Sequence, residues 1–162
     1  MDNQIYVLAE RAGRLLARHK ILLVTAESCT GGWIAEAITA VAGSSAWFER
    51  GFVSYSNQAK QDMLGVSADT LGRHGAVSEA VVLEMARGAI QRSKGHISVA
   101  VSGVAGPDGG TPDKPVGTVW IAWGQKLGHA EAEVFQFSGD RQAVREQTVI
   151  RALQGLIARM GG

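Results

Sequence analysis

A serine lies in a run of small and hydroxyl-bearing residues that directly follows a short apolar segment. The run is Thr25-Ala26-Glu27-Ser28-Cys29-Thr30-Gly31-Gly32, and the apolar segment is Ile21-Leu22-Leu23-Val24. The apolar segment predicts a strand, and the periodic apolar residues from Trp33 to Val41 predict a helix. Open α/β sheets bind ligands at such a turn, because free backbone N–H groups and the positive helix end converge there. Ser28 is therefore a candidate nucleophile with glycine amides as oxyanion donors; a phosphate cradle and a helix cap are the alternatives.

A serine nucleophile requires a group that accepts its proton. A histidine-based triad is possible in principle, and of the four histidines only His74 falls in a loop-like segment. Lysine is the other candidate, because Tyr55 and Lys60 lie on either side of an expected strand-to-helix junction. Lys60 acts as a base only if burial lowers its pKa toward neutrality. The residues alone leave both kinds of base open.

A second glycine-rich turn, from Ser102 to Gly110, follows another buried strand pattern at His96 to Val101. We expect both turns to emerge at the same edge of the sheet. Neither turn has the GxGxxG pattern or the P-loop pattern, so dinucleotide or ATP binding is not indicated. Backbone amides and small hydroxyls nevertheless suit a mononucleotide phosphate or a small anion.

Length and composition limit the class of protein. The 162 residues, 46% of them hydrophobic, predict one globular domain over 1–162. The 16 basic and 15 acidic residues nearly balance, which argues against nucleic acid as a partner. The single Cys29 and the scattered histidines give no disulfide and no metal site. No apolar run approaches the roughly 20 residues that cross a bilayer, so we expect a cytoplasmic protein without a membrane partner.

Helical and strand patterns alternate along the chain. Helices are predicted over 5–19, 33–41, 57–64, 68–71, 79–90 and 141–159, and strands over 21–24, 52–55, 96–101, 118–123 and 130–137. The last two strands form a hairpin around 124–128. This order predicts an α/β fold, a three-layer α/β/α sandwich on a mixed, mainly parallel sheet.

The motifs, in this order, resemble those of the CinA C-terminal domain family. The resemblance spans nearly the whole chain and rests on 25–32, 43–48, 55–57, 75–78, 102–110 and 115–119. It implies the same three-layer sandwich, without a cofactor. The activity implied is hydrolysis of the carboxamide of nicotinamide mononucleotide (NMN) to nicotinate mononucleotide and ammonia, a salvage step. We do not expect the pyrophosphatase chemistry of the additional N-terminal domain in longer members.

The resemblance also implies roles for individual residues. Ser28 would be the nucleophile and Lys60 its base, with Tyr55 close by. The oxyanion and carboxamide region would be lined by Cys29, Thr30, Gly31 and Gly32. The nucleotide would be held by Ser45, Ser102, Gly103 and Gly106, and Arg141 would neutralise its phosphate. A homodimer or higher homo-oligomer is the expected assembly.

Two other functions stay open at this point. One is an amidase centred on Cys29, since thiols are good nucleophiles. The other is a non-catalytic nucleotide-sensing or competence-related binding domain that has kept the pocket. Without the resemblance, Ser28 would also fit a helix cap, and Lys60 would fit a solvated charge on an exposed helix face.

Overall fold

A computed structural model describes residues 3–162; Met1 and Asp2, part of the domain predicted over 1–162, lie outside the described residues. The described chain forms one five-stranded sheet in the order β2-β1-β3-β4-β5. The strands are β1 (Leu23–Glu27), β2 (Phe48–Val53), β3 (Ile97–Gly103), β4 (Thr118–Gln125) and β5 (Ala130–Gln136). β1 pairs in parallel with β2 and β3, whereas the pairings of β3 with β4 and of β4 with β5 are antiparallel. The sheet is thus mixed, and in the described chain only β4 runs against the other strands.

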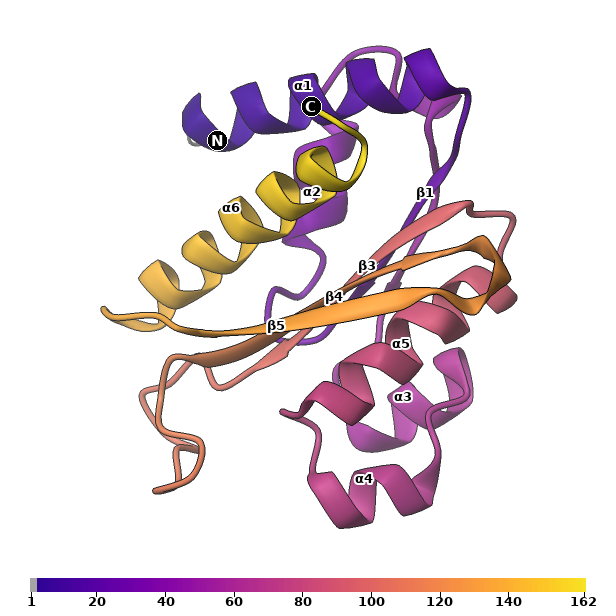
Figure 1. Cartoon of the computed structure of the whole chain (residues 1–162). Helices are drawn as coiled ribbons and strands as arrows, with labels where there is room; N and C mark the ends of the chain where they lie inside the picture. Colours follow the sequence, from indigo (N-terminus) through magenta and orange to yellow (C-terminus); the bar gives the residue numbers. More distant parts are fainter. Residues whose placement is uncertain (1–2) are drawn as a thin grey trace.

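Helices cover both faces of this sheet (Figure 1). The helices are α1 (Asn3–His19), α2 (Trp33–Thr39), α3 (Asn57–Leu64), α4 (Ala68–His74), α5 (Glu79–Gln91) and α6 (Arg141–Arg159), with 3-10 turns at Ser44–Ala46 and Lys126–Gly128. α1, α2 and α6 lie on one face, and α3, α4 and α5 lie on the other. Each face has its own apolar core, one against α1, α2 and α6 and one centred on α5. The predicted three-layer α/β/α sandwich is confirmed.

Two strands differ from their predicted bounds. β1 continues through Thr25, Ala26 and Glu27, which were predicted to lie in the turn. All five of its residues are buried because β1 is an inner strand with an apolar core on each face. β2 begins at Phe48 rather than at residue 52. It is an edge strand with an irregular register beside Leu23, so its sequence lacks the apolar alternation of a strand with one buried face.

One edge of the sheet gathers the functional turns. The C-terminal ends of β1, β2 and β3 meet there, and β4 begins at the same edge because it is antiparallel to β3. The chain leaving β1 leads to β2, whereas the chain leaving β3 leads to β4 on the other side. A crevice opens between two strand ends whose connections diverge in this way, and ligands of open α/β sheets bind in such crevices.

Candidate active site

A cleft of about 280 Å³ lies at this edge of the sheet. It brings together most of the predicted site residues, namely Ser28, Cys29, Tyr55, Lys60, Ser102, Gly103, Gly106 and Arg141. Asn57, at the start of α3, and Asp108 also line it, although neither was singled out from the sequence. Segments far apart in the chain therefore converge on one small space.

Lys60 reaches the cleft from the first turns of α3. This helix begins where the Ser56 hydroxyl accepts a hydrogen bond from the Ala59 N–H, at 3.0 Å. The cap directs Lys60 inward, and the side chain is only 1% exposed. Its Nζ lies 3.0 Å from the Ser28 Oγ. Lys60 is therefore not a solvated charge on an exposed helix face.

Two backbone carbonyls complete the surroundings of Lys60. Its Nζ donates to the Ser54 and Tyr55 carbonyl oxygens, each at 2.9 Å. In the ammonium form, the third N–H of Lys60 donates to the Ser28 Oγ; in the neutral form, the two N–H bonds serve these carbonyls and the lone pair faces the Ser28 hydroxyl. Burial lowers the pKa of Lys60 below its ordinary value, which favours this neutral form.

Ser28 is fixed at the end of β1. Its N–H donates to the Val101 carbonyl at 3.2 Å, which extends the pairing of β1 with β3 by one residue. Its Oγ also lies 3.4 Å from the Tyr55 carbonyl oxygen. The backbone of Ser28 is therefore fixed by β3, and its hydroxyl contacts the Lys60 amine.

Cys29, the neighbour of Ser28, is buried. Burial raises the pKa of its thiol to about 11, so the thiolate is scarce at neutral pH. Ser28, not Cys29, is the side chain in contact with Lys60. The geometry favours the hydroxyl as the nucleophile.

Glu27 organises the turn from inside the protein, a role the sequence analysis did not assign. Its carboxylate accepts from the Thr30 hydroxyl at 2.6 Å and from the Ile34 and Ala35 N–H groups at 2.8 and 3.0 Å. Burial raises the pKa of Glu27, and these hydrogen bonds oppose the rise. A carboxylate at the N-terminus of α2 thus ties the turn to the helix that follows it.

The amides of Gly31 and Gly32 are already engaged within the turn. Gly31 N–H donates to the Ser28 carbonyl at 3.0 Å, and Gly32 N–H interacts with the Glu27 carboxylate. Both glycines have positive φ, 60° and 106°, which side-chain-bearing residues rarely adopt. The two glycines therefore shape the turn, while Thr30 contributes its hydroxyl to Glu27.

Arg145 holds the same turn from outside and was also missed. Its Nε donates to the Cys29 carbonyl at 3.0 Å, and its Nη2 donates to the Thr30 carbonyl at 3.1 Å. Its guanidinium carbon lies 5.5 Å from the centre of the Trp33 ring. The signal available in the sequence was its spacing from Arg141, since residues four apart lie on one face of a helix.

Arg141 spans the mouth of the cleft. Its Nη1 donates to the Gly106 carbonyl at 2.7 Å, and its Nη2 lies 3.3 Å from the Tyr55 hydroxyl. Asp140 instead caps α6 by accepting from the Ala143 N–H at 2.9 Å. Arg141 is therefore available to an anion, and its present hydrogen-bond partners are both neutral.

Ser102 lies on the wall of the cleft formed by the end of β3, as the second-to-last residue of that strand. The residue is 1% exposed and lines the cleft. Among residues 3–162 its hydroxyl has no hydrogen-bond partner. A buried hydroxyl facing a cleft in this way can bind a polar group of a ligand.

Comparison with known protein families adds independent information. The CinA C-terminal domain matches residues 5–160. The chain belongs to this family.

Relatives in this family match the chain along nearly its whole length. Nicotinamide-nucleotide amidohydrolase PncC from Pseudomonas putida is 59% identical over 155 residues, 96% of each chain. PncC from Escherichia coli strain K12 is 54% identical over 155 residues, 96% of this chain and 94% of that protein. The crystal structure of competence/damage inducible protein CihA from Agrobacterium tumefaciens superposes with a TM-score of 0.96 at 44% identity, covering 100% of this chain and 98% of that one.

Four predicted site residues do not line the cleft: Thr30, Gly31 and Gly32 belong to the turn after Ser28, and Ser45 lies farther away. Ser45 belongs to the 3-10 turn before β2, at the opposite edge of the sheet, where the Trp47 carbonyl accepts from the Leu23 N–H. Ser45 therefore lines no part of the cleft within this chain. His74 ends α4 and is absent from the surroundings of Ser28, which leaves Lys60 as the base in contact.

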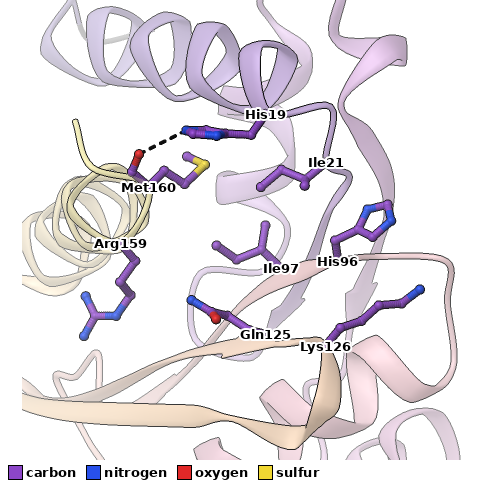
Figure 2. Close-up of a pocket in the computed structure, with 8 residues that line it drawn as sticks. All are labelled: His19, Ile21, His96, Ile97, Gln125, Lys126, Arg159 and Met160. Atoms are coloured by element: carbon purple, nitrogen blue, oxygen red, sulfur yellow. Dashed lines mark hydrogen bonds between the residues drawn. The ribbon is translucent and has the colours of Figure 1, made fainter.

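A larger hollow of about 460 Å³ lies at that opposite edge (Figure 2). Its walls include His19 and Arg159, at the ends of α1 and α6. His19 Nε2 bonds the Met160 carbonyl at 3.2 Å, and Arg159 pairs with Glu131 at 2.8 Å. These two side chains are engaged by the helix end and by β5, and no predicted site residue lies there. The predicted site residues that share a cavity line the smaller cleft, not this hollow.

Within 3–162, no group of three or more histidine, cysteine, aspartate or glutamate side chains is arranged to hold a metal ion. In the same part of the chain, every helix is too short or too polar to traverse a bilayer.

Proposed function

We propose that the chain is a nicotinamide-nucleotide amidohydrolase that hydrolyses the carboxamide of NMN to nicotinate mononucleotide and ammonia. The observation that carries the proposal is the 3.0 Å contact between the buried Lys60 Nζ and the Ser28 Oγ. An amine held against a hydroxyl at the end of a strand is suited to activating a serine nucleophile. The names of the relatives from Pseudomonas putida and Escherichia coli support the same substrate class.

Acylation begins with neutral Lys60. Lys60 takes the proton of Ser28 as the Oγ attacks the carboxamide carbon, and the carbonyl oxygen becomes an oxyanion. When the carbon–nitrogen bond breaks, the Lys60 ammonium gives that proton to the leaving nitrogen, and ammonia departs. The product of this half-reaction is an ester of Ser28 with the nicotinate nucleotide. The pyridinium charge of NMN assists the attack by withdrawing electrons from the carboxamide.

Deacylation uses the same two residues. Lys60, neutral again, takes a proton from a water molecule as the water oxygen attacks the ester carbon. The carbon–Oγ bond then breaks, and Ser28 recovers its proton from Lys60. The acid product gives its remaining proton to solvent and leaves as nicotinate mononucleotide, so one water is consumed and one ammonia is released per cycle.

The nucleotide is placed along the far wall of the cleft. Ser102, with its unpartnered hydroxyl, and the turn containing Gly103 and Gly106 would contact the ribose and phosphate. Arg141 would bind the phosphate, exchanging its neutral partners Gly106 and Tyr55 for charged oxygens. Tyr55 contributes its backbone carbonyl to Lys60 and its hydroxyl to Arg141.

This role would belong to pyridine-nucleotide salvage. The cytoplasmic location, expected from the apolar patterning, and the homo-oligomer, expected from the family resemblance, stay predictions. The competing function is a nucleotide-sensing domain that binds without turnover, and the buried Ser28–Lys60 contact favours catalysis over that function.

Ammonia release from NMN tests the proposal. We expect turnover by the wild-type protein and its loss in Ser28→Ala, with Cys29→Ala as the matched neighbour that keeps activity. Tight NMN binding without ammonia release by the wild type would support the sensing domain instead. Nicotinamide riboside and the dinucleotide, assayed in parallel, would define the substrate range.

A further inference from the structure

The turn after Ser28 leaves two adjacent N–H groups without a partner in another residue. In the part of the chain that the structure describes, the N–H groups of Cys29 and Thr30 donate to no other residue, whereas those of Ser28 and Gly31 are bonded. Cys29 and Thr30 come immediately after the proposed nucleophile. The N–H of the residue after a nucleophile is well placed for an oxyanion, because it lies beside the carbon under attack.

Arg145 holds the two peptide units on either side of Thr30. A peptide unit is planar and trans, so its C=O and N–H point in opposite directions. The unit that carries the Thr30 N–H also carries the Cys29 carbonyl, which Arg145 Nε holds at 3.0 Å. Arg145 Nη2 holds the next carbonyl, that of Thr30, at 3.1 Å. The guanidinium fork thus orients two successive peptide units from behind.

The rest of the turn is held by complementary contacts. The Ser28 carbonyl accepts from Gly31 N–H at 3.0 Å, which orients the peptide unit that carries the Cys29 N–H. Glu27 accepts the Thr30 hydroxyl and the first amides of α2. A buried carboxylate therefore engages donors of the turn while Arg145 engages its acceptors. The N–H groups of Cys29 and Thr30 are the donors left over.

Of these two residues, only Cys29 lines the cleft. We propose that the Cys29 N–H is the oxyanion donor and that Arg145 is the residue that positions it. The inference rests on the proposed amidohydrolase function. Arg145 touches the backbone of the turn, so it acts through those peptide units rather than on the substrate. An oxyanion exists only in the transition state and the tetrahedral intermediate, so loss of the arginine lowers kcat with little effect on KM.

Helix α6 supplies a matched control. Arg151 stacks on Phe135 with its guanidinium carbon 5.5 Å from the ring centre, the same distance as between Arg145 and Trp33. Arg151 lies outside the cleft. Arg151→Gln therefore removes the same charge and the same kind of ring contact from the same helix, but leaves the turn after Ser28 intact.

The test compares steady-state ammonia release from NMN by Arg145→Gln, Arg145→Lys and Arg151→Gln. We expect Arg145→Gln to lower kcat about 10- to 100-fold with KM within about twofold of wild type. Arg145→Lys, which keeps one cationic donor, should recover part of kcat, and Arg151→Gln should match the wild type within about twofold.

Three outcomes would overturn the inference. One is an unchanged kcat in Arg145→Gln, and another is a rise in KM alone, which would mark Arg145 as a phosphate ligand instead. If thermal unfolding shows that Arg145→Gln does not fold, the test rests on Arg145→Lys. A wild-type kcat in Arg145→Lys is then the third outcome that would overturn the inference. A wild-type protein that releases no ammonia would refute the proposed function itself, whereas turnover that is indifferent to Arg145 refutes this inference alone.

Discussion

The Nζ of Lys60 lies 3.0 Å from the Oγ of Ser28, although the two residues are 32 positions apart in the chain. The contact exists because β1 and β2 are parallel neighbours, so their C-terminal ends deliver the two residues to the same edge of the sheet. α3 then turns Lys60 back toward Ser28, and both residues are buried at the cleft.

Replacing Lys60 by a residue that cannot exchange a proton should abolish most of the activity. We expect Lys60→Met and Lys60→Arg each to lower kcat/KM by about 10²- to 10⁴-fold, because methionine has no basic nitrogen and arginine stays protonated. Ammonia release measures the loss. Lys126→Met, at the far edge of the sheet, is the control and should keep wild-type activity. Substantial turnover by Lys60→Arg would contradict the assignment of Lys60 as base.

The activity should rise with pH. Burial lowers the pKa of Lys60 in the folded protein, and the reaction requires the neutral amine, so kcat/KM should increase as pH passes through that lowered pKa. Stability should change in the same direction. Between the lowered pKa and the ordinary one the unfolded chain binds more protons, so the free energy of unfolding rises with pH there. Lys60→Met should remove this contribution, and a flat kcat/KM profile from pH 6 to 9, with chemistry shown to limit the rate, would count against the mechanism.

Cys29 should be dispensable for chemistry. Its thiol has a pKa raised to about 11 and little exposure, so we expect Cys29→Ala to keep activity within about threefold of wild type. Alkylation of the native protein by iodoacetamide should be slow at pH 7.5 and fast after unfolding. Inactivation of Cys29→Ala with an unchanged thermal unfolding profile would reopen the thiol as nucleophile.

Glu27 should contribute to both stability and rate. The two oxygens of the Glu27 carboxylate accept from the Ile34 and Ala35 N–H groups. In Glu27→Gln one of these oxygens becomes an NH₂ donor, so one N–H loses its acceptor, and the free energy of unfolding should fall by about 1–3 kcal/mol. The turn that carries Ser28 should loosen, so kcat should fall as well. Chemical denaturation and ammonia release measure the two effects. Glu36→Gln, on the exposed side of α2, is the control that should leave both unchanged.

Packing of α6 on the sheet should depend on one glycine. A Cβ on Gly155 would overlap the indole of Trp123, whose Nε1 donates to the Ala152 carbonyl at 3.1 Å. We expect Gly155→Ala to cost about 1–3 kcal/mol of stability through this overlap. Gly72→Ala in α4, where nothing lies within 4 Å of the new Cβ, should instead be neutral or stabilising. Thermal unfolding of the two variants would reveal the opposite signs.

The sequence predicted the layers and the two functional turns because apolar periodicity and glycine placement are local signals. Ser28 and Lys60 were found in this way, with the family resemblance choosing between lysine and histidine as the base. Glu27 and Arg145 were missed because their roles depend on tertiary contacts with the turn, which have no local pattern. The predicted start of β2 was too late because this edge strand has an irregular register. It carries charged residues at positions where an inner strand would have apolar ones.

The placement of Arg141 and Lys60 separates two uses of positive charge. Arg141 lies at the exposed mouth of the cleft, while Lys60 is buried at its base. Dissolved ions screen the first and scarcely reach the second. Under the proposed function, ionic strength would act on capture of the phosphorylated substrate and acidity on the bond-breaking step, so the two properties of the solution would act through different residues.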